Sequence, residues 1–232
     1  MAFKAGALGA VIPAGGRGRR FLSRAPKLLT RVAGRPVLVH TLKNLLKAAV
    51  FSDVVVAASP TLERVLKPLL KRHGLGRVRV VRGGATRAES VRRGVEALNG
   101  RCRWVLVHDA ARPLVGRELV GRTLRAARRT GAALCALPAT ATVKRAERGI
   151  VRSTEPRERL WLAQTPQVFE LRRLEERYRR LKGWRGATDE AALFDGSGVR
   201  VGVVPGEPRN IKITTREDLE LMRFYLGVRG KG

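Results

Sequence analysis

The sequence has few cysteines, few aromatic residues, few acidic residues and no long apolar run, and each shortage excludes a class of protein. Its 2 cysteines, Cys102 and Cys135, form no paired motif, which argues against a disulfide framework or a zinc site and favours a reducing compartment. No apolar run approaches the length of a membrane-spanning helix. Gly6 and Gly9 interrupt the short apolar run at the start, so a signal peptide is not expected. We therefore expect a cytoplasmic location and no membrane partner.

Acidic residues are scarce relative to basic ones. Lys and Arg number 48 against 19 Asp and Glu, which gives a formal net charge of +29 at pH 7. Such an excess attracts polyanions, so a non-catalytic basic nucleic-acid-binding protein is one interpretation. However, aromatic residues for base stacking make up only 5% of the chain, and the arginines fall throughout it. We therefore expect most of these charges to coat solvated faces, with no specific nucleic-acid partner.

The hydrophobic residues, 44% of the chain, are enough for one sizeable core and are arranged in alternating strand and helix patterns. Expected strands cover residues 53–58, 78–81, 104–109, 132–137 and 199–204. Expected helices cover residues 36–49, 60–73, 87–98, 118–130, 171–181 and a stretch after Thr215, where Thr215 and Asp218 predict a capping box. The alternation predicts an α/β fold, a single Rossmann-like three-layer domain over residues 1–232 with a mostly parallel sheet. A charged, Thr-rich interruption predicts an extended β-arm at about residues 139–159.

A glycine-rich loop follows the apolar run at residues 7–12. Its members are Pro13, Ala14, Gly15, Gly16 and Gly18. Glycines let backbone N–H groups approach a phosphate closely, and the basic residues Arg20 and Lys27 supply opposite charge nearby. The loop lacks the third glycine of the dinucleotide-binding pattern and the lysine-hydroxyl ending of a Walker loop. It therefore predicts nucleotide binding of another kind.

Other chemistry-bearing residues follow the expected strands, whose carboxyl ends should meet at one edge of the sheet. Gly83 and Gly84 follow one strand, and Asp109 and Arg112 follow another. A carboxylate there can accept hydrogen bonds from hydroxyl groups or help to hold a magnesium ion, and Arg112 can orient Asp109 or a phosphate. His108 is expected to be a packed residue. We expect the active site at this edge.

Six further motifs appear in order along the chain. They are Gly83-Gly84-x-x-Arg87-x-x-Ser90-Val91, His108-Asp109-Ala110-Ala111-Arg112-Pro113, Thr142-x-Lys144, Leu160-Trp161-x-x-Gln164-Thr165-Pro166-Gln167, Thr188-Asp189-Glu190-Ala191 and Asn210-Ile211-Lys212-Ile213-Thr214. Together with the glycine loop, they resemble the 2-C-methyl-D-erythritol 4-phosphate cytidylyltransferase family over nearly the whole chain. Two positions depart from the family pattern: Ala85 and Arg209 stand where acidic residues are common.

The resemblance implies that CTP and a polyol phosphate, 2-C-methyl-D-erythritol 4-phosphate, give a CDP-alcohol and pyrophosphate. It implies Mg²⁺ bound through the CTP phosphates, with Asp109 as a further possible ligand. Arg20 and Lys27 would stabilise the transition state, while Arg157 and Lys212 would position the attacking phosphate. Because little covalent participation by the protein is needed in such a transfer, cations should dominate the site.

The resemblance also implies two sets of binding residues. The nucleotide-binding set comprises Pro13, Ala14, Gly15, Gly16, Gly18, Gly83, Gly84, Arg87 and Ser90. The substrate-binding set comprises Asp109, Arg112, Thr142 and Thr165. In the family the arm crosses to a second subunit, which implies a homodimer in which Thr142 and Arg157 complete a neighbour's site. A ribitol-5-phosphate cytidylyltransferase shares most of the motifs and remains an alternative.

Overall fold

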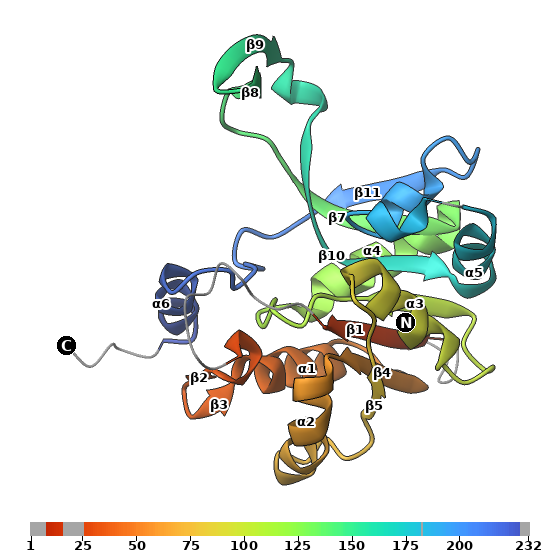
Figure 1. Cartoon of the computed structure of the whole chain (residues 1–232), viewed down its shortest axis with the longest axis vertical. Coiled ribbons are helices and arrows are strands. Elements are labelled where there is room, and N and C mark those ends of the chain that lie inside the picture. The colour runs from red at the N-terminus through yellow and green to blue at the C-terminus, as the bar shows by residue number, and fades with distance from the viewer. Residues whose placement is uncertain (1–7, 16–25, 182, 228–232) are drawn as a thin grey trace.

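A seven-stranded sheet forms the centre of the chain in a computed structural model that describes residues 8–15, 26–181 and 183–227. The strand order is β11-β7-β10-β6-β1-β4-β5. The strands are β1 (Leu8–Ala14), β4 (Asp53–Ala58), β5 (Arg79–Arg82), β6 (Trp104–Val107), β7 (Ala132–Pro138), β10 (Trp161–Glu170) and β11 (Val201–Pro205). β10 runs antiparallel to both of its neighbours, and the other pairs are parallel. The arrowheads of β10 and β11 point in opposite directions in Figure 1. The expected mostly parallel sheet is confirmed.

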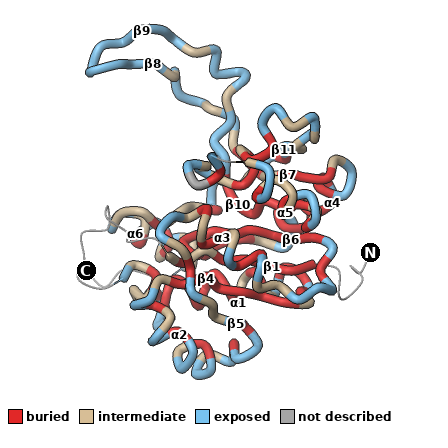
Figure 2. The backbone as a smooth tube through the Cα atoms, turned by 45° about the vertical axis from the view of Figure 1, so that its right-hand side comes forward, coloured by how far each residue is buried: buried red, intermediate tan, exposed pale blue. Residues whose placement is uncertain are grey.

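Helices cover both faces of this sheet. They are α1 (Val37–Ala48), α2 (Pro60–Arg72), α3 (Arg87–Glu96), α4 (Arg117–Thr130), α5 (Leu171–Arg180) and α6 (Glu217–Tyr225). Successive strand residues point to opposite faces, so Ala10 and Ile12 pack in one buried cluster with α1, α2 and α4, whereas Val11 packs in another with α3 and α5. The buried residues follow these two interfaces (Figure 2). The three-layer architecture is confirmed.

The helices begin and end where short-range chemistry favours it. The Ser59 hydroxyl accepts a hydrogen bond from the Leu62 N–H at the start of α2, and Thr86 and Glu89 form a reciprocal capping box at α3. α4 ends at Gly131, whose φ of +91° belongs to the left-handed region that favours glycine. These caps fix the direction in which α2 and α3 leave the strand ends.

Three details of the secondary structure differ from the expectation. Only half of the expected capping box of the last helix forms: the Asp218 carboxylate accepts from the Thr215 N–H, and also from the Thr214 N–H, but α6 begins at Glu217 after an N-cap at Arg216. The chain after the arm is a strand, β10, that the hydrophobic pattern did not reveal. A short hairpin, β2 (Arg31–Val32) with β3 (Arg35–Pro36), was also not expected.

The arm is a separate antiparallel pair, β8 (Val143–Glu147) with β9 (Ile150–Glu155), followed by a 3₁₀ turn, η2 (Arg157–Arg159). It projects from the body of the molecule (Figure 1). Its base is closed where the Ala139 N–H donates to the Leu160 carbonyl and β7 resumes pairing with β10. The expected extended β-arm is therefore confirmed.

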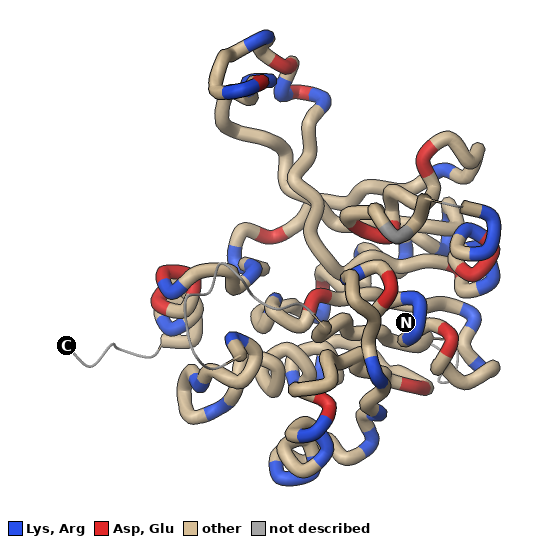
Figure 3. The backbone as a smooth tube through the Cα atoms, viewed as in Figure 1, with Lys and Arg blue, Asp and Glu red and all other residues tan. Residues whose placement is uncertain are grey.

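Basic residues are spread over the helices, loops and arm of the described chain (Figure 3). This distribution agrees with the expectation that most of them coat solvated faces. None of the helices in the described ranges is long and apolar enough to cross a membrane.

Candidate active site

Four parallel strands end at the same edge of the sheet, and the site is built on their ends. β1 ends at Ala14, β4 at Ala58, β5 at Arg82 and β6 at Val107. The chain adds β4 and β5 on one side of β1 and then places β6 on the other, so the strand order reverses at β1. Ligands of open α/β sheets bind in the crevice at such a reversal. Gly15, directly after β1, lies at this reversal.

Two glycine segments converge on one buried hydroxyl. A Cβ added to Gly15 would lie 2.6 Å from the Ser90 Oγ, and one added to Gly83 would lie 2.8 Å from the same atom. The Ser90 hydroxyl also accepts from the Gly84 N–H at 3.1 Å and donates to the Thr86 carbonyl at 2.9 Å. Only residues without a side chain allow this close approach. The segments after β1 and β5 thus pack directly against each other at the strand ends.

The structure therefore brings together part of the expected nucleotide-binding set. Pro13 and Ala14 end β1, beside Gly15 and opposite the Gly83-Gly84 segment. Gly16, Gly18 and the expected transition-state residue Arg20 lie outside the described residues. Their roles stay predictions.

Asp109, just past β6, is the centre of a cluster of charges. Its carboxylate lies 2.8 Å from the Lys212 Nζ, 3.2 Å from the Arg87 Nε and 3.6 Å from the Arg112 Nε. The residue is only 7% exposed. Burial by itself would raise the pKa of Asp109, but the charges of Arg87, Lys212 and Arg112 outweigh burial and hold that pKa well below its usual range. Asp109 is therefore an ionised acceptor at neutral pH.

Arg87 joins Asp109 to a second carboxylate, Glu190. The Arg87 Nη1 lies 2.9 Å from each oxygen of Glu190, while its Nε donates to Asp109. Burial raises the pKa of Glu190 to about 7, and the two carboxylates together raise the pKa of Arg87 despite its own burial. The expected nucleotide ligand Arg87 thus sits between two acidic groups, one of which the sequence motifs contained without a role.

The loop that carries Asp109 is fixed by His108 and Thr165. The Thr165 hydroxyl accepts from the Asp109 N–H at 3.0 Å and lies 3.1 Å from the His108 Nδ1. The His108 Nε2 lies 3.0 Å from the Arg112 carbonyl, so the neutral Nε2–H tautomer satisfies both contacts. Burial lowers the pKa of His108 to about 4, which keeps that tautomer neutral. His108 is packed, as expected, and Thr165 acts on the backbone of Asp109.

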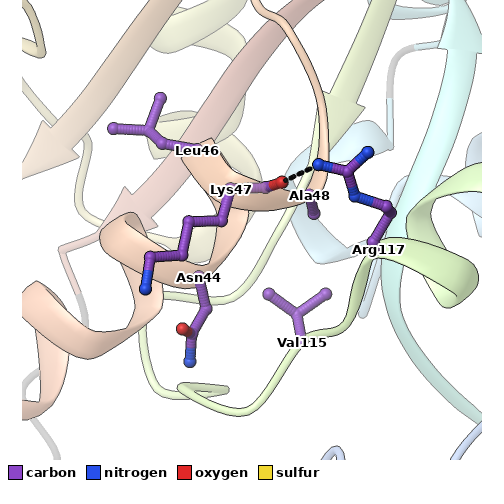
Figure 4. Close-up of a pocket in the computed structure, with 6 residues that line it drawn as sticks. All are labelled: Asn44, Leu46, Lys47, Ala48, Val115 and Arg117. Atoms are coloured by element: carbon purple, nitrogen blue, oxygen red, sulfur yellow. Dashed lines mark hydrogen bonds between the residues drawn. The ribbon is translucent and has the colours of Figure 1, made fainter.

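The segment after Asp109 lies along α1. The Thr41 hydroxyl donates to the Ala110 carbonyl at 2.8 Å, the Asn44 amide donates to the Pro113 carbonyl at 2.6 Å, and the Arg117 Nη2 donates to the Lys47 carbonyl at 3.1 Å. Figure 4 shows this last contact beside a surface hollow. The hollow is lined by Asn44, Leu46, Lys47, Ala48, Val115 and Arg117. It shares no residue with the Asp109 cluster, so it lies outside the candidate site.

A return segment near the C-terminus brings two lysines to the same edge. The Ile213 N–H donates to the Ala111 carbonyl, and the Arg112 Nη1 donates to the Asn210 carbonyl, which docks the segment on the Asp109 loop. The Lys27 Nζ donates to the Ile213 carbonyl at 2.9 Å. Lys212 lies on this segment and Lys27 contacts it, so the two lysines come together although they are distant in sequence.

The arm residues are placed differently. The Arg157 Nη1 donates to the Thr140 carbonyl at 2.8 Å within the arm, and its side chain is half exposed. Thr142 is exposed just before β8. Neither residue contacts the Asp109 cluster within one described chain.

Arg209, which stands where the family commonly has an acidic residue, has a contact of its own. Its guanidinium lies over the Tyr225 ring of α6.

The described residues do not build a metal site of their own. They hold no group of three or more His, Cys, Asp or Glu side chains that could bind a metal ion. Asp109, the carboxylate at the site, is already paired with cations on both oxygens. This donor set does not fit a protein-bound divalent cation, and it argues against Asp109 as a direct ligand.

Comparison with known proteins decides the family. The family model for 2-C-methyl-D-erythritol 4-phosphate cytidylyltransferase matches residues 8–228. The chain belongs to this family. It is 39% identical over 221 residues to a relative of that name from Syntrophus aciditrophicus, and the match covers 94% of each chain. Family membership makes the chain a nucleotidyltransferase.

Solved structures agree. A 4-diphosphocytidyl-2C-methyl-D-erythritol synthase from Anaerococcus prevotii superposes with a TM-score of 0.81 at 31% identity, covering 95% of this chain and 98% of that one. A 2-C-methyl-D-erythritol 4-phosphate cytidylyltransferase from Thermus thermophilus gives a TM-score of 0.76 at 35% identity, covering 96% of this chain and 100% of that one. The comparisons favour neither ribitol-5-phosphate transfer nor a non-catalytic nucleic-acid-binding role.

Proposed function

We propose that the chain transfers the CMP group of CTP to the phosphate of 2-C-methyl-D-erythritol 4-phosphate in non-mevalonate isoprenoid precursor synthesis. The observation that carries this proposal is the convergence of Lys212, Arg87 and Arg112 on Asp109, with Lys27 on the neighbouring Ile213 carbonyl, at the strand-order reversal. Both substrates are polyanions, and this edge supplies the opposite charge. The names of the family and of the relative from Syntrophus aciditrophicus contain this acceptor and the transfer of a cytidylyl group.

The chemistry needs no nucleophile from the protein. An oxygen of the polyol phosphate attacks the α-phosphorus of CTP, the new oxygen–phosphorus bond forms, and the bond from the α-phosphorus to the bridging oxygen breaks. The electron pair leaves on pyrophosphate. Fixed cations stabilise the crowded, charged transition state, a role we assign to Lys27 and Arg20, while Lys212 and Arg157 hold the attacking phosphate.

The contact between Gly15 and Ser90 brings the main chain of the two glycine segments together at the strand ends. We propose that these main-chain groups read the base edge in a pyrimidine-sized slot that is too small for a purine. We propose that ionised Asp109, paired with Arg112, accepts hydrogen bonds from the polyol hydroxyls. We propose Mg²⁺ as the divalent ion, which would be held by the CTP phosphates and would neutralise their charge.

The arm supports a homodimer. It exposes Ile150 and Val151, each 59% exposed, and its base exposes Leu162 at 60% and Trp161 at 46%. An arm that leaves the body with apolar side chains in water suits a second copy of the chain. We propose that the partner's Thr142 and Arg157 complete each site. The two cysteines, both free and buried, support a cytoplasmic location.

Pyrophosphate release by the purified protein tests the proposal. We expect release with CTP and 2-C-methyl-D-erythritol 4-phosphate, and far less when ATP or GTP replaces CTP or when ribitol 5-phosphate replaces the acceptor. Equal turnover with ATP would contradict the slot. Faster turnover with ribitol 5-phosphate would contradict the proposal that 2-C-methyl-D-erythritol 4-phosphate is the acceptor.

A further inference from the structure

Only two of the three guanidinium nitrogens of Arg87 donate hydrogen bonds to described residues. Its Nε donates to Asp109 and its Nη1 to both oxygens of Glu190. Its Nη2 makes no hydrogen bond to any residue in the described ranges, and the side chain is 25% exposed. A guanidinium is planar, so fixing Nε and Nη1 also fixes the direction of Nη2. The two carboxylates therefore fix the orientation of Arg87.

The backbone around Glu190 is fixed by hydrogen bonds to β10. Glu190 is 1% exposed, and the residues on either side of it bond to Gln167 of β10. The Gln167 side chain donates to Asp189 at 2.8 Å and accepts from the Ala191 N–H at 3.2 Å, and the Asp189 carboxylate accepts from the Ala192 N–H at 3.0 Å. Gln167 is fully buried. The Glu190 carboxylate therefore has a fixed backbone beneath it, as a positioning group requires.

We propose that Glu190 is a positioning residue that holds Arg87 against Asp109 and so fixes Asp109 for the polyol phosphate. The motifs place Arg87 in the nucleotide-binding set, but its Nε contacts Asp109 of the substrate-binding set, so we expect its displacement to act on the polyol phosphate. This inference rests on the proposed function. Burying a carboxylate is costly, and an apolar side chain of similar size would serve packing alone as well or better. A fixed Arg87 keeps Asp109 turned toward its own hydrogen-bond partners and holds Nη2 in one direction. Asp109 would lose this orientation if Arg87 could swing.

Glu190→Gln keeps the shape of the side chain but removes its charge and one of the two oxygens that accept from the Arg87 Nη1. Assays are run at about pH 8, above the pKa of about 7 that burial gives Glu190, so that the wild-type carboxylate is ionised. We expect the KM for 2-C-methyl-D-erythritol 4-phosphate to rise about tenfold, with the KM for CTP changed less than about twofold. A merely structural defect would move both constants or neither.

Asp189→Asn is the matched control. Asp189 precedes Glu190 and pins the same segment, but it does not contact Arg87 in the structure. We expect this variant to be less stable to heat and, because Arg87 keeps its partner carboxylate, to raise the KM for the polyol phosphate by a smaller factor than Glu190→Gln does. If Asp189→Asn raises that KM as much as Glu190→Gln does, Glu190 acts through the segment and the inference is wrong.

A double-mutant cycle tests whether Glu190 acts through Arg87. In an Arg87→Met background, adding Glu190→Gln should cause no further rise in the KM for the polyol phosphate. Additive effects would overturn the inference. Should the Gln variant fail to fold, Glu190→Asp keeps the charge but draws it back from Arg87, and it should raise the same KM by a smaller factor; an unchanged KM overturns the inference.

A crystal structure of Glu190→Gln separates this inference from the proposed function. We expect the Arg87 side chain to leave Asp109, and an unmoved guanidinium would overturn the inference even if the wild-type chain is active. A wild-type chain that does not transfer CMP would refute the proposed function, whereas the placement of Arg87 would still be decided by the structure.

Discussion

Replacing Asp109 with asparagine should destabilise the fold, because it removes the charge that three cations share. The asparagine side chain would keep the shape of the aspartate but leave Arg87, Lys212 and Arg112 without their common partner. Arg112 is itself buried, and burial lowers its pKa. The cations would then repel one another in a site that water enters poorly.

The magnitude follows from the burial of the cluster. Removing one partner of a buried ion pair costs about 3–5 kcal/mol, and we expect the low end, about 3 kcal/mol, because Lys212 is 39% exposed and partly screened. For a chain of this size that loss lowers the melting temperature by roughly 6–12 °C. The kcat/KM for the polyol phosphate should also fall about a hundredfold, since the hydroxyl acceptor is weakened.

The pH dependence gives a check on the cause. The folded-state pKa of Asp109 lies below its unfolded value, so its contribution to stability is complete above the unfolded pKa of about 4 and is lost as pH falls further. The stability difference between the wild-type and Asp109→Asn chains should therefore be constant near neutral pH and shrink below about pH 4.

Thermal unfolding at fixed protein concentration measures these differences, with Glu63→Gln as the control. Glu63 pairs with the exposed Arg82, and such surface pairs contribute little. The control should melt like the wild-type chain. An Asp109→Asn chain that also melts like wild type at neutral pH would refute the view that Asp109 neutralises the cluster.

Three further predictions concern the slot, the catalytic charge and the arm. Gly15→Ala should raise the KM for CTP about tenfold, because its Cβ would meet the Ser90 Oγ at 2.6 Å. The control Gly76→Ala has open space around the new Cβ and should leave that KM unchanged. Equal KM values for CTP in the two variants would refute the slot. Lys27→Ala should lower kcat about a hundredfold, with little change in the affinity for CTP measured by calorimetry. Near-normal turnover would refute the role of Lys27 in stabilising the transition state. Mixing Arg157→Ala and Lys27→Ala chains should restore activity, since one site of a mixed dimer has both residues; confirmed subunit exchange without recovery would refute the shared site.

Most of the parallel sheet could be predicted because the centres of its strands are apolar. The segment of β4 from Asp53 to Ala58 is buried throughout, and its bounds were as expected. β10 was missed because its centre contains Gln164, Thr165, Pro166 and Gln167, which show no hydrophobic pattern. Partners that are remote in sequence satisfy these buried groups: Glu207 for Gln164, Asn210 for Thr165, and Asp189 for Gln167. Such partners cannot be found from local spacing.

The candidate site was predictable to the extent that it follows from strand ends. The positions of Gly83, Gly84 and Asp109 depend only on where parallel strands finish, and the structure places them at one edge. The pairing of Arg87 with Glu190 joins residues 103 positions apart, and no periodicity indicates it. The motif around Glu190 was the one available signal, but only the fold shows which side chain it meets.

Product identification with the wild-type protein tests the central claim most directly. CTP and 2-C-methyl-D-erythritol 4-phosphate are incubated with the enzyme and Mg²⁺, and the products are followed by phosphorus NMR and mass spectrometry. We predict one CDP-alcohol, with its new diphosphate linkage, for each pyrophosphate released. Pyrophosphate that appears with free CMP and no CDP-alcohol, or no consumption of CTP at all, would contradict the proposed transfer.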